Sequence, residues 1–360
     1  MSPRARAAAF CERYGLRVPV LMGPMAGSSP PALAAAVAEA GGMGGCGAVL
    51  MPPAAIAAWA ADFRTRSAGA FQINLWVPDP EPVVDPEAAA RVAALLAARG
   101  VAMGEPAPLP DFAAQGLAVL AARPTAASSI MGLFPPALVD ALHAAGIAWF
   151  ACVTSVGEAE AAAAAGADAL VVSGVEAGGH RGGFTPASAA RQAGTLFALL
   201  PLIADRVDAP LIAAGGIADG RGVAAALMLG ASAVQVGTAL LRAAEADTPA
   251  PYADALARAL PDDTVLTPAF SGRLARAVRN GWTDAVGDDA LPYPLQRAAT
   301  GPLKAKALAD GDTDAMQMWA GQAAALARAA PAGALVARWW ADAQALLGNE
   351  PRAAALGSAT

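Results

Sequence analysis

Residues 169–184 read ALVVSGVEAGGHRGGF, the pattern of a buried strand followed at once by a polar loop. The aliphatic run stops at Ser173, and an acid, several glycines, His180 and an arginine follow within a few positions. A strand that ends in a glycine-rich loop lets backbone and side chains approach a ligand closely. Since His180 is one of only two histidines in the chain, we expect a functional site in this loop.

The same unit, a short apolar run followed by an alanine-rich helical segment, recurs about eight times along the chain. Strict alternation of this kind predicts a parallel (β/α)8 TIM barrel, an α/β fold. An open doubly wound sheet is the competing architecture, and the number of repeats and the absence of an early GxGxxG favour the barrel. The predicted strands are 18–22, 44–48, 70–75, 124–130, 148–153, 169–173, 211–214 and 233–236.

The alternation stops after Thr238. Residues 245–302 lack a strand pattern and are rich in Pro, Asp and Arg, which predicts a mostly helical lobe that covers the barrel mouth. Helices are expected at 313–329 and 332–347. The predicted organisation is a barrel over 1–244, a cap lobe over 245–312, helices that pack back on the barrel over 313–347, and a frayed tail over 348–360.

Composition narrows the class of protein. The chain has 360 residues, 56% of them hydrophobic, with alanine in excess. No apolar run reaches the length of a membrane span, and no signal peptide is recognisable. The net charge of −6 is spread without a basic block, which argues against nucleic-acid binding. Three distant cysteines without Cys-x-x-Cys argue against disulfides and metal sites. We expect a cytoplasmic monomer or homodimer that acts on small molecules.

Two glycine-containing turns follow the last two predicted strands. The first carries Gly215 and Gly216, and the second carries Gly237 and Thr238. In a barrel, these two turns and a helix N-terminus form the commonest phosphate site, because bare N–H groups and the helix dipole attract the anion. Either turn alone is simply a tight turn. The pair in this order indicates a phosphate-containing ligand.

Residues after the first and third strands are suited to a flat ring system. Met22 and Gly23 end the first strand, where backbone groups and a soft thioether can meet a ring. Plain core filling is the alternative for Met22. Asn74 offers both a donor and an acceptor to a ring with alternating N–H and C=O groups, although a turn-forming role before the proline-rich loop is equally consistent.

His180 carries the clearest chemistry, because imidazole is the side chain best matched to proton transfer near neutral pH. The alternative is a structural histidine that bonds a neighbouring loop. Glu176 is expected to orient His180 or the loop, and Arg181 to be a surface or phosphate-facing charge. His143 sits late in a predicted helix, where a cation suits the dipole, and we interpret it as structural.

Nine stretches spread over nearly the whole chain form a distinctive set. They are, in order, PVLMGPMAG, GGMGGCGA, FQINLW, TSVGEAEAAAAAGADALVVSGVEAGGHRGGF, PLIAAGGIADGRG, VQVGTALL, FSGRLARAVRN, YPLQRAATGPLK and MWAGQ. In sequence and order they resemble motifs of the nitronate monooxygenases, formerly called 2-nitropropane dioxygenases. The resemblance implies a barrel that holds FMN non-covalently beneath a helical lobe. One departure is Ser173, where the family usually carries Gln, and serine cannot make the same bidentate contact.

The resemblance also implies roles for individual residues. His180 corresponds to the family's active-site histidine, and Tyr293 and Lys304 lie in a C-terminal motif that borders the substrate or the flavin. The expected FMN contacts are Met22, Gly23, Asn74, Ser173, Gly178, Gly215, Gly216, Gln235, Val236, Gly237 and Thr238.

The activity that the resemblance implies is oxidation of alkyl nitronates, such as propionate 3-nitronate, by O2 to a carbonyl compound and nitrite. His180 would position the anionic nitro group, or act as a base on a neutral nitroalkane. An NAD(P)H-dependent reductase of quinones or enoyl thioesters on the same FMN barrel is the nearest alternative. A binding protein, or a flavin-free barrel that holds a sugar phosphate, is the alternative from a different class.

Overall fold

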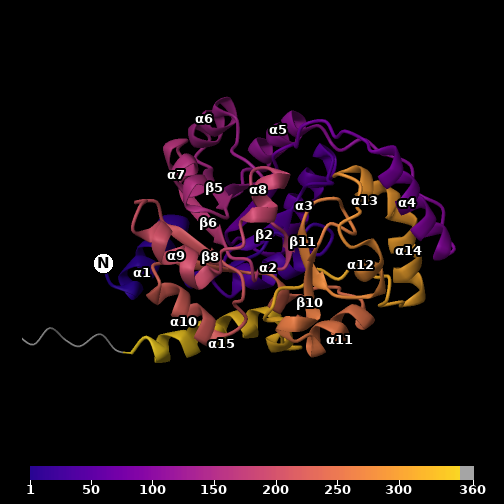
Figure 1. The fold of residues 1–360 in the computed structure, drawn as a ribbon. Coiled ribbons are helices and arrows are strands. Elements are labelled where there is room, and N and C mark those ends of the chain that lie inside the picture. Colours follow the sequence, from indigo (N-terminus) through magenta and orange to yellow (C-terminus); the bar gives the residue numbers. More distant parts are fainter. Residues whose placement is uncertain (349–360) are drawn as a thin grey trace, which may run out of the picture.

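The computed structural model describes residues 1–348, and its central element is a sheet of eight parallel strands (Figure 1). The strand order is β1-β9-β8-β6-β5-β4-β3-β2, and a parallel bridge between Leu21 and Met43 joins the two edges into a barrel. The predicted TIM barrel is confirmed. The strands are β1 (Val20–Met22), β2 (Gly44–Gly47), β3 (Phe71–Trp76), β4 (Ala126–Ile130), β5 (Ala148–Val153), β6 (Ala169–Ser173), β8 (Leu211–Ala214) and β9 (Ala233–Val236).

Helices surround the barrel, and proline begins many of them because the first helical position needs no N–H donor. The C-terminal helix α15 (Ala332–Leu346) packs on α10 and α2, as Figure 1 shows for α10. The other helices of this layer are α1 (Pro3–Tyr14), α2 (Pro31–Glu39), α3 (Pro53–Arg66), α5 (Phe112–Ala122), α6 (Pro136–Ala144), α7 (Val156–Ala164), α8 (Pro186–Arg191), α9 (Leu196–Ala204) and α10 (Gly220–Met228). No helix within residues 1–348 is long and apolar enough to cross a bilayer.

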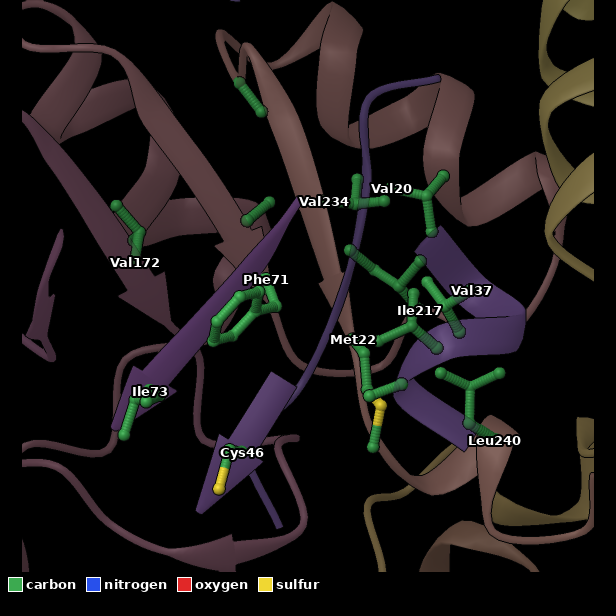
Figure 2. Close-up of a cluster of buried hydrophobic side chains, with 14 of the residues drawn as sticks. Val20, Met22, Val37, Cys46, Phe71, Ile73, Val172, Ile217, Val234 and Leu240 are labelled. Carbon is green, nitrogen blue, oxygen red and sulfur yellow. The ribbon is translucent and has the colours of Figure 1, made fainter. Parts of the chain in front are cut away.

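Alternate residues of each strand face opposite sides of the barrel wall. Val20 and Met22 of β1 point outward into the layer between strands and helices, near Val37 of α2 (Figure 2). Leu21, between them, belongs to a second core inside the barrel. The inner core ends at α1, whose Phe10 and Tyr14 pack on Phe150 with ring centroids 6.3 and 5.1 Å apart. The barrel floor is therefore closed, and only the opposite end is open to ligands.

A three-stranded antiparallel sheet joins the barrel to the C-terminal lobe. Its strands are β7 (Gly179–His180), β10 (Thr264–Thr267) and β11 (Ala275–Val278), and His180 lies opposite Ala275. The expectation that 245–302 lacks strands is therefore wrong. The strands are short: β10 and β11 pair with each other over four residues, and β11 also pairs with the distant β7, so the sequence pattern of the segment does not mark them clearly.

The lobe is otherwise helical and has a core of its own around Trp282 and Phe270. It contains η1 (Thr238–Leu240), α11 (Ala250–Arg258), η2 (Pro261–Asp263), α12 (Gly281–Val286), α13 (Leu295–Ala299) and α14 (Gly301–Asp310). Helix α4 (Pro86–Ala98), which follows β3 in sequence, lies beside α12 to α14 (Figure 1) and contributes Val92 and Leu96 to this core. The exact domain boundaries stay a prediction.

The expected helix over 313–329 is absent from the described structure, where only the short helix η3 (Ala324–Leu326) forms in this segment. Its backbone instead bonds to distant strands and loops: Val278 N donates to Met318 O at 2.8 Å, and Ala320 N donates to Arg276 O at 3.1 Å. Tertiary pairing thus overrides the helix propensity of an alanine-rich stretch. The expected helix at 332–347 is confirmed, and the tail beyond residue 348 lies outside the described residues.

Candidate active site

A cavity of about 350 Å³ opens at the carboxyl ends of the barrel strands, with the lobe as its second wall. This is the end of a TIM barrel at which active sites are found. Most of the residues predicted from sequence meet here. The predicted residues that line the cavity are Gly23, Asn74, Ser173, Gly178, His180, Gly215, Gly216, Gln235, Gly237, Thr238, Tyr293 and Lys304.

Two predicted contacts, Met22 and Val236, do not line the cavity. Both side chains are buried in the layer outside the barrel wall, where Figure 2 shows Met22. Their backbones are also engaged, since Val236 O accepts from Gly23 N at 2.8 Å and Met22 O accepts from Gln72 Nε2 at 3.1 Å. Side chains alternate between the two faces of a strand, and those of Met22 and Val236 fall on the outer face. Met22 therefore fills the core.

One end of the cavity, which we call the glycine end, is formed by Gly178, Gly215, Gly216, Gly237 and Thr238. A Cβ atom on Gly178 would lie 2.5 Å from Gly321 N and 2.8 Å from Thr238 Oγ1, so no side chain fits there. Gly215 has a φ of 119°, which L side chains rarely adopt. Thr238 Oγ1 accepts from Gly321 N at 3.0 Å, which leaves its own O–H to donate to an anion.

Amide side chains form the middle of the cavity wall. Gln72 Nε2 donates to Gln235 Oε1 at 3.0 Å, and Asn74 Nδ2 donates to Ser128 O and Oγ at 3.1 Å. These bonds leave the NH2 group of Gln235 and the carbonyl oxygen of Asn74 for a ligand. Asn74 therefore lies inside β3 and bonds to β4, rather than forming a turn. Gln72 was not predicted, although its polar side chain alternates with Phe71 and Ile73.

Ser173 also lines the cavity, at the end of β6. Its backbone carbonyl accepts a hydrogen bond from Arg181 Nη1 at 3.4 Å. The short side chain leaves open space where the resemblance leads one to expect Gln.

The opposite end, which we call the histidine end, is formed by His180, Trp76, Ser271, Tyr293 and Trp319. The His180 ring meets Trp76 and Trp319 edge-on, with centroids 4.6 and 5.0 Å away. Its Nε2 lies 2.8 Å from Ser271 Oγ. Burial of the ring, and then the positive charges of Arg273 and Lys304, lower the pKa of His180 to about 3. His180 is therefore neutral near pH 7.

The loop that carries His180 is held by two charged residues, Arg181 and Glu176. Of the two roles expected for Glu176, orienting His180 or the loop, the structure shows the second. Arg181 is not at the surface: it is 1% exposed and donates to Gly174 O and Gln192 O, both at 2.7 Å. Glu176 accepts from Leu196 N at 2.9 Å and so caps α9, without a hydrogen bond to His180. Both side chains fix the loop, because its buried carbonyls and the helix end need partners. The surface and phosphate-facing interpretations of Arg181 are wrong.

Three lobe residues give the histidine end its polarity. Tyr293 Oη is buried and has no hydrogen-bond partner among the described residues, and burial raises the pKa of this phenol to about 12. Lys304 Nζ donates to Arg297 O at 3.0 Å, and burial followed by the Arg297 charge lowers the pKa of Lys304 to about 8. Neither the Lys304 ammonium nor the Arg297 guanidinium forms an ion pair within residues 1–348. This end therefore attracts anions.

Ser271, Arg297 and Trp319 were not predicted as site residues. Ser271 precedes β11 of the small antiparallel sheet, Arg297 lies on α13, and Trp319 lies on the irregular segment after α14. All three fall within stretches that resemble the family, but no residue pattern there marks them as facing the cavity. His143, by contrast, is where we expected it, at the last turn of α6 with Nε2 2.9 Å from Asp168 Oδ2.

Comparisons with known proteins agree with this geometry. The sequence model of the family described as "Nitronate monooxygenase" matches residues 9–342. The chain is 39% identical over 346 residues to a nitronate monooxygenase from Pseudomonas aeruginosa, covering 91% of this chain and 96% of that one. It is 38% identical over 349 residues to a nitronate monooxygenase from Paraburkholderia phytofirmans, covering 92% and 93% of the two chains.

Solved structures agree as well. A nitroalkane oxidase from Streptomyces ansochromogenes superposes with a TM-score of 0.87 at 35% identity, over 92% of this chain and 98% of that one. FabK from Thermotoga maritima superposes with a TM-score of 0.71 at 26% identity, over 94% and 96% of the two chains. The chain therefore belongs to the nitronate monooxygenase family and is an oxidoreductase.

Proposed function

We propose that this chain uses FMN and O2 to oxidise alkyl nitronates to a carbonyl compound and nitrite. The observation that carries the proposal is the polarity of the histidine end, where, among the residues that the structure describes, Lys304 and Arg297 have no carboxylate partner and Tyr293 Oη has no hydrogen-bond partner. An anionic substrate satisfies all three groups. His180 beside them is neutral. A neutral imidazole suits a nitro group better than a protonated imidazole would, because the ring is already hydrogen-bonded.

The cavity fits FMN on two observations. The glycine end is a cradle in which the absence of a side chain on Gly178 lets its backbone pack against Gly321 N and Thr238 Oγ1, and the bare N–H groups there with the Thr238 hydroxyl suit a phosphate. The free amide of Gln235 and the free carbonyl of Asn74 suit the alternating acceptors and donors of an isoalloxazine ring. Bound FMN would supply the electron transfer between the nitronate and O2.

The protein's own residues bind and orient the substrate. Propionate 3-nitronate carries a carboxylate as well as the nitronate, which suits two cations in one wall. Lys304 and Arg297 hold the anionic groups, Tyr293 donates a hydrogen bond, and the indoles of Trp76 and Trp319 exclude water. His180 positions the nitro group, or accepts a proton if the neutral nitroalkane is the substrate.

The decisive experiment measures nitrite release and O2 consumption when the purified protein meets propionate 3-nitronate. The overall reaction balances when two nitronate anions and one O2 give two carbonyl compounds and two nitrite ions. A yellow protein that produces no nitrite would disprove the proposal. Bleaching of the flavin by NADH under anaerobic conditions would favour the reductase instead, and a colourless protein would favour the flavin-free alternative.

We also propose a cytoplasmic location and a monomeric or homodimeric state. Cys11, Cys46 and Cys152 are all free and buried, and burial raises the pKa of the Cys11 thiol to about 11. Such thiols are inert and suit a reducing compartment. Light scattering on the eluting protein measures the oligomeric state directly.

A further inference from the structure

The hydroxyl of Ser271 lies at the centre of a small buried network. Its Oγ is 2.8 Å from His180 Nε2, 3.1 Å from Arg273 O and 3.3 Å from Arg273 N. A backbone N–H can only donate and a carbonyl can only accept, while the hydroxyl has a single proton. The destination of that proton decides which nitrogen of the His180 ring carries a hydrogen.

Only one arrangement satisfies every group in the network. If Ser271 donates to Arg273 O, then Oγ accepts from both Arg273 N and His180 Nε2–H, and all three partners are bonded. If Ser271 donated to His180 instead, Arg273 O would have no donor within the described residues. A buried carbonyl without a partner is costly, so the first arrangement is favoured.

We propose that Ser271 is a positioning residue that holds His180 in the Nε2–H tautomer and leaves Nδ1 as the unprotonated nitrogen of the ring. Nδ1 has no hydrogen-bond partner among the described residues, so it is the nitrogen left for a ligand. The functional meaning rests on the proposed function: an unprotonated Nδ1 accepts a proton but does not donate to nitro oxygens, so of the two roles proposed for His180 this tautomer fits the base that acts on a neutral nitroalkane.

The network is held rigidly from outside the cavity. Ser271 is 3% exposed, and the neighbouring Arg273 is 1% exposed. Arg273 donates to both carboxylate oxygens of Asp79 at 2.7 and 2.8 Å, and to Gly183 O at 3.2 Å. Backbone pairing of His180 with Ala275 fixes the other side. The Ser271 hydroxyl is therefore held at a defined position against the His180 ring, which is required if it is to fix the tautomer of that ring.

The test is the ¹⁵N NMR spectrum of the purified holoenzyme labelled at histidine. The chain has only two histidines, and His143→Gln assigns the other one. Protonated and unprotonated ring nitrogens are resolved from each other, so the tautomer of His180 is observed directly at pH 7. We expect a protonated Nε2. A protonated Nδ1 in the unmodified protein overturns the proposal without any variant.

Ser271→Ala removes only the hydroxyl oxygen. We expect a mixture of His180 tautomers and a fall of about tenfold in kcat/KM for a neutral nitroalkane, about the effect of one lost hydrogen bond. Ser271→Thr, which keeps the hydroxyl, is expected to restore the spectrum. Ser232→Ala, a buried serine at the barrel floor, is the control and leaves the spectrum unchanged. An unchanged His180 spectrum in Ser271→Ala overturns the proposal.

The result separates the two proposals. The expected tautomer in a protein that does not oxidise nitronates leaves the role of Ser271 intact and disproves the proposed function. Nitronate oxidation by a protein with the opposite tautomer does the reverse.

Discussion

The glycine end and the histidine end of the cavity are built in different ways. The glycine end consists of backbone from barrel turns, where Gly178 and Gly215 leave no room for a side chain. The histidine end consists of side chains, and most of them, including Ser271 and Tyr293, come from the lobe. A site made of backbone requires glycines, whose lack of a side chain leaves the N–H groups accessible. A site made of side chains requires that segments distant in sequence come together.

If the chain binds FMN and a nitronate as proposed, this difference separates cofactor binding from substrate selection. Backbone N–H groups at strand ends are fixed by the barrel, so substitutions in the lobe are expected to leave them in place. The histidine end can change with single substitutions in the lobe. We therefore expect changes at the glycine end to abolish binding, and changes at the histidine end to alter rate, affinity or stability separately.

The largest effect is expected from Gly178→Ala at the glycine end. The new Cβ would lie 2.5 Å from Gly321 N, and backbone cannot yield at that distance without disrupting the cradle. We expect the purified protein to lose its flavin absorbance. Gly157→Ala is the control, because a Cβ there meets no atom within 4 Å. A Gly178→Ala protein with full flavin content would show that the backbone does not form the site.

The next effect is expected from His180→Asn at the histidine end. Removing a general base typically lowers the rate by 10² to 10⁴. Because the pKa of His180 is lowered to about 3, far below the operating pH, we expect the lower end of this range, about a hundredfold lower kcat with a neutral nitroalkane. Flavin content should be unchanged, which separates the two ends of the cavity. The matched control is His143→Asn, the other histidine, on α6. Full activity of His180→Asn would remove the histidine from the mechanism.

Asp79→Ala tests the connection between barrel and lobe. It leaves the Arg273 guanidinium, whose side chain is 1% exposed, without a carboxylate. Removing one partner of a buried ion pair costs about 3 kcal/mol or more of unfolding free energy, which urea denaturation measures. Asp310→Ala breaks the exposed pair with Lys306 and should leave stability unchanged. Equal stability of the two variants would contradict a structural role for Arg273.

The smallest effect is expected at Lys304, whose pKa is lowered to about 8. A lysine is cationic below its pKa, so the attraction for an anionic substrate is present at pH 7 and is lost as pH rises through about 8. KM for propionate 3-nitronate should rise about tenfold between pH 7 and 9, the worth of one charged hydrogen bond. Lys304→Met should have the high KM at both pH values. A pH-dependent KM in this variant, or a raised KM in Lys306→Met, would contradict the assignment.

The barrel strands could be predicted from the sequence to within about two residues, because most strands carry their own apolar run and several are followed by a glycine-containing turn. Strand β6 was expected at 169–173 and is found as Ala169–Ser173. The glycines of the glycine end were also predictable, because glycine is the residue that allows close approach of backbone and ligand. The same local rule failed at Met22 and Val236, where strand alternation turns the side chains outward.

The lobe could not be predicted in the same way. Strand β11 lies between its neighbour β10 and the distant β7, which carries His180, and the alanine-rich segment after Thr313 stays irregular because its backbone bonds to β11 instead of to itself. Ser271 carries no sign in the sequence that it faces a histidine from another part of the chain. Contacts between segments that are distant in sequence depend on tertiary pairing, so a local sequence pattern does not predict them.

The pairing of β7 with β11 has a consequence for the order of folding. The barrel closes with β9, whereas His180 gains its strand partner only from residues synthesised later. Contacts between distant segments carry a larger loop-closure cost and form late. During synthesis, the barrel turns that carry Gly178, Gly215 and Gly237 would thus exist before the strand partner of His180 and before Gly321, which packs against Gly178 and Thr238. Both ends of the cavity would therefore be complete only after the C-terminal segments have joined the barrel.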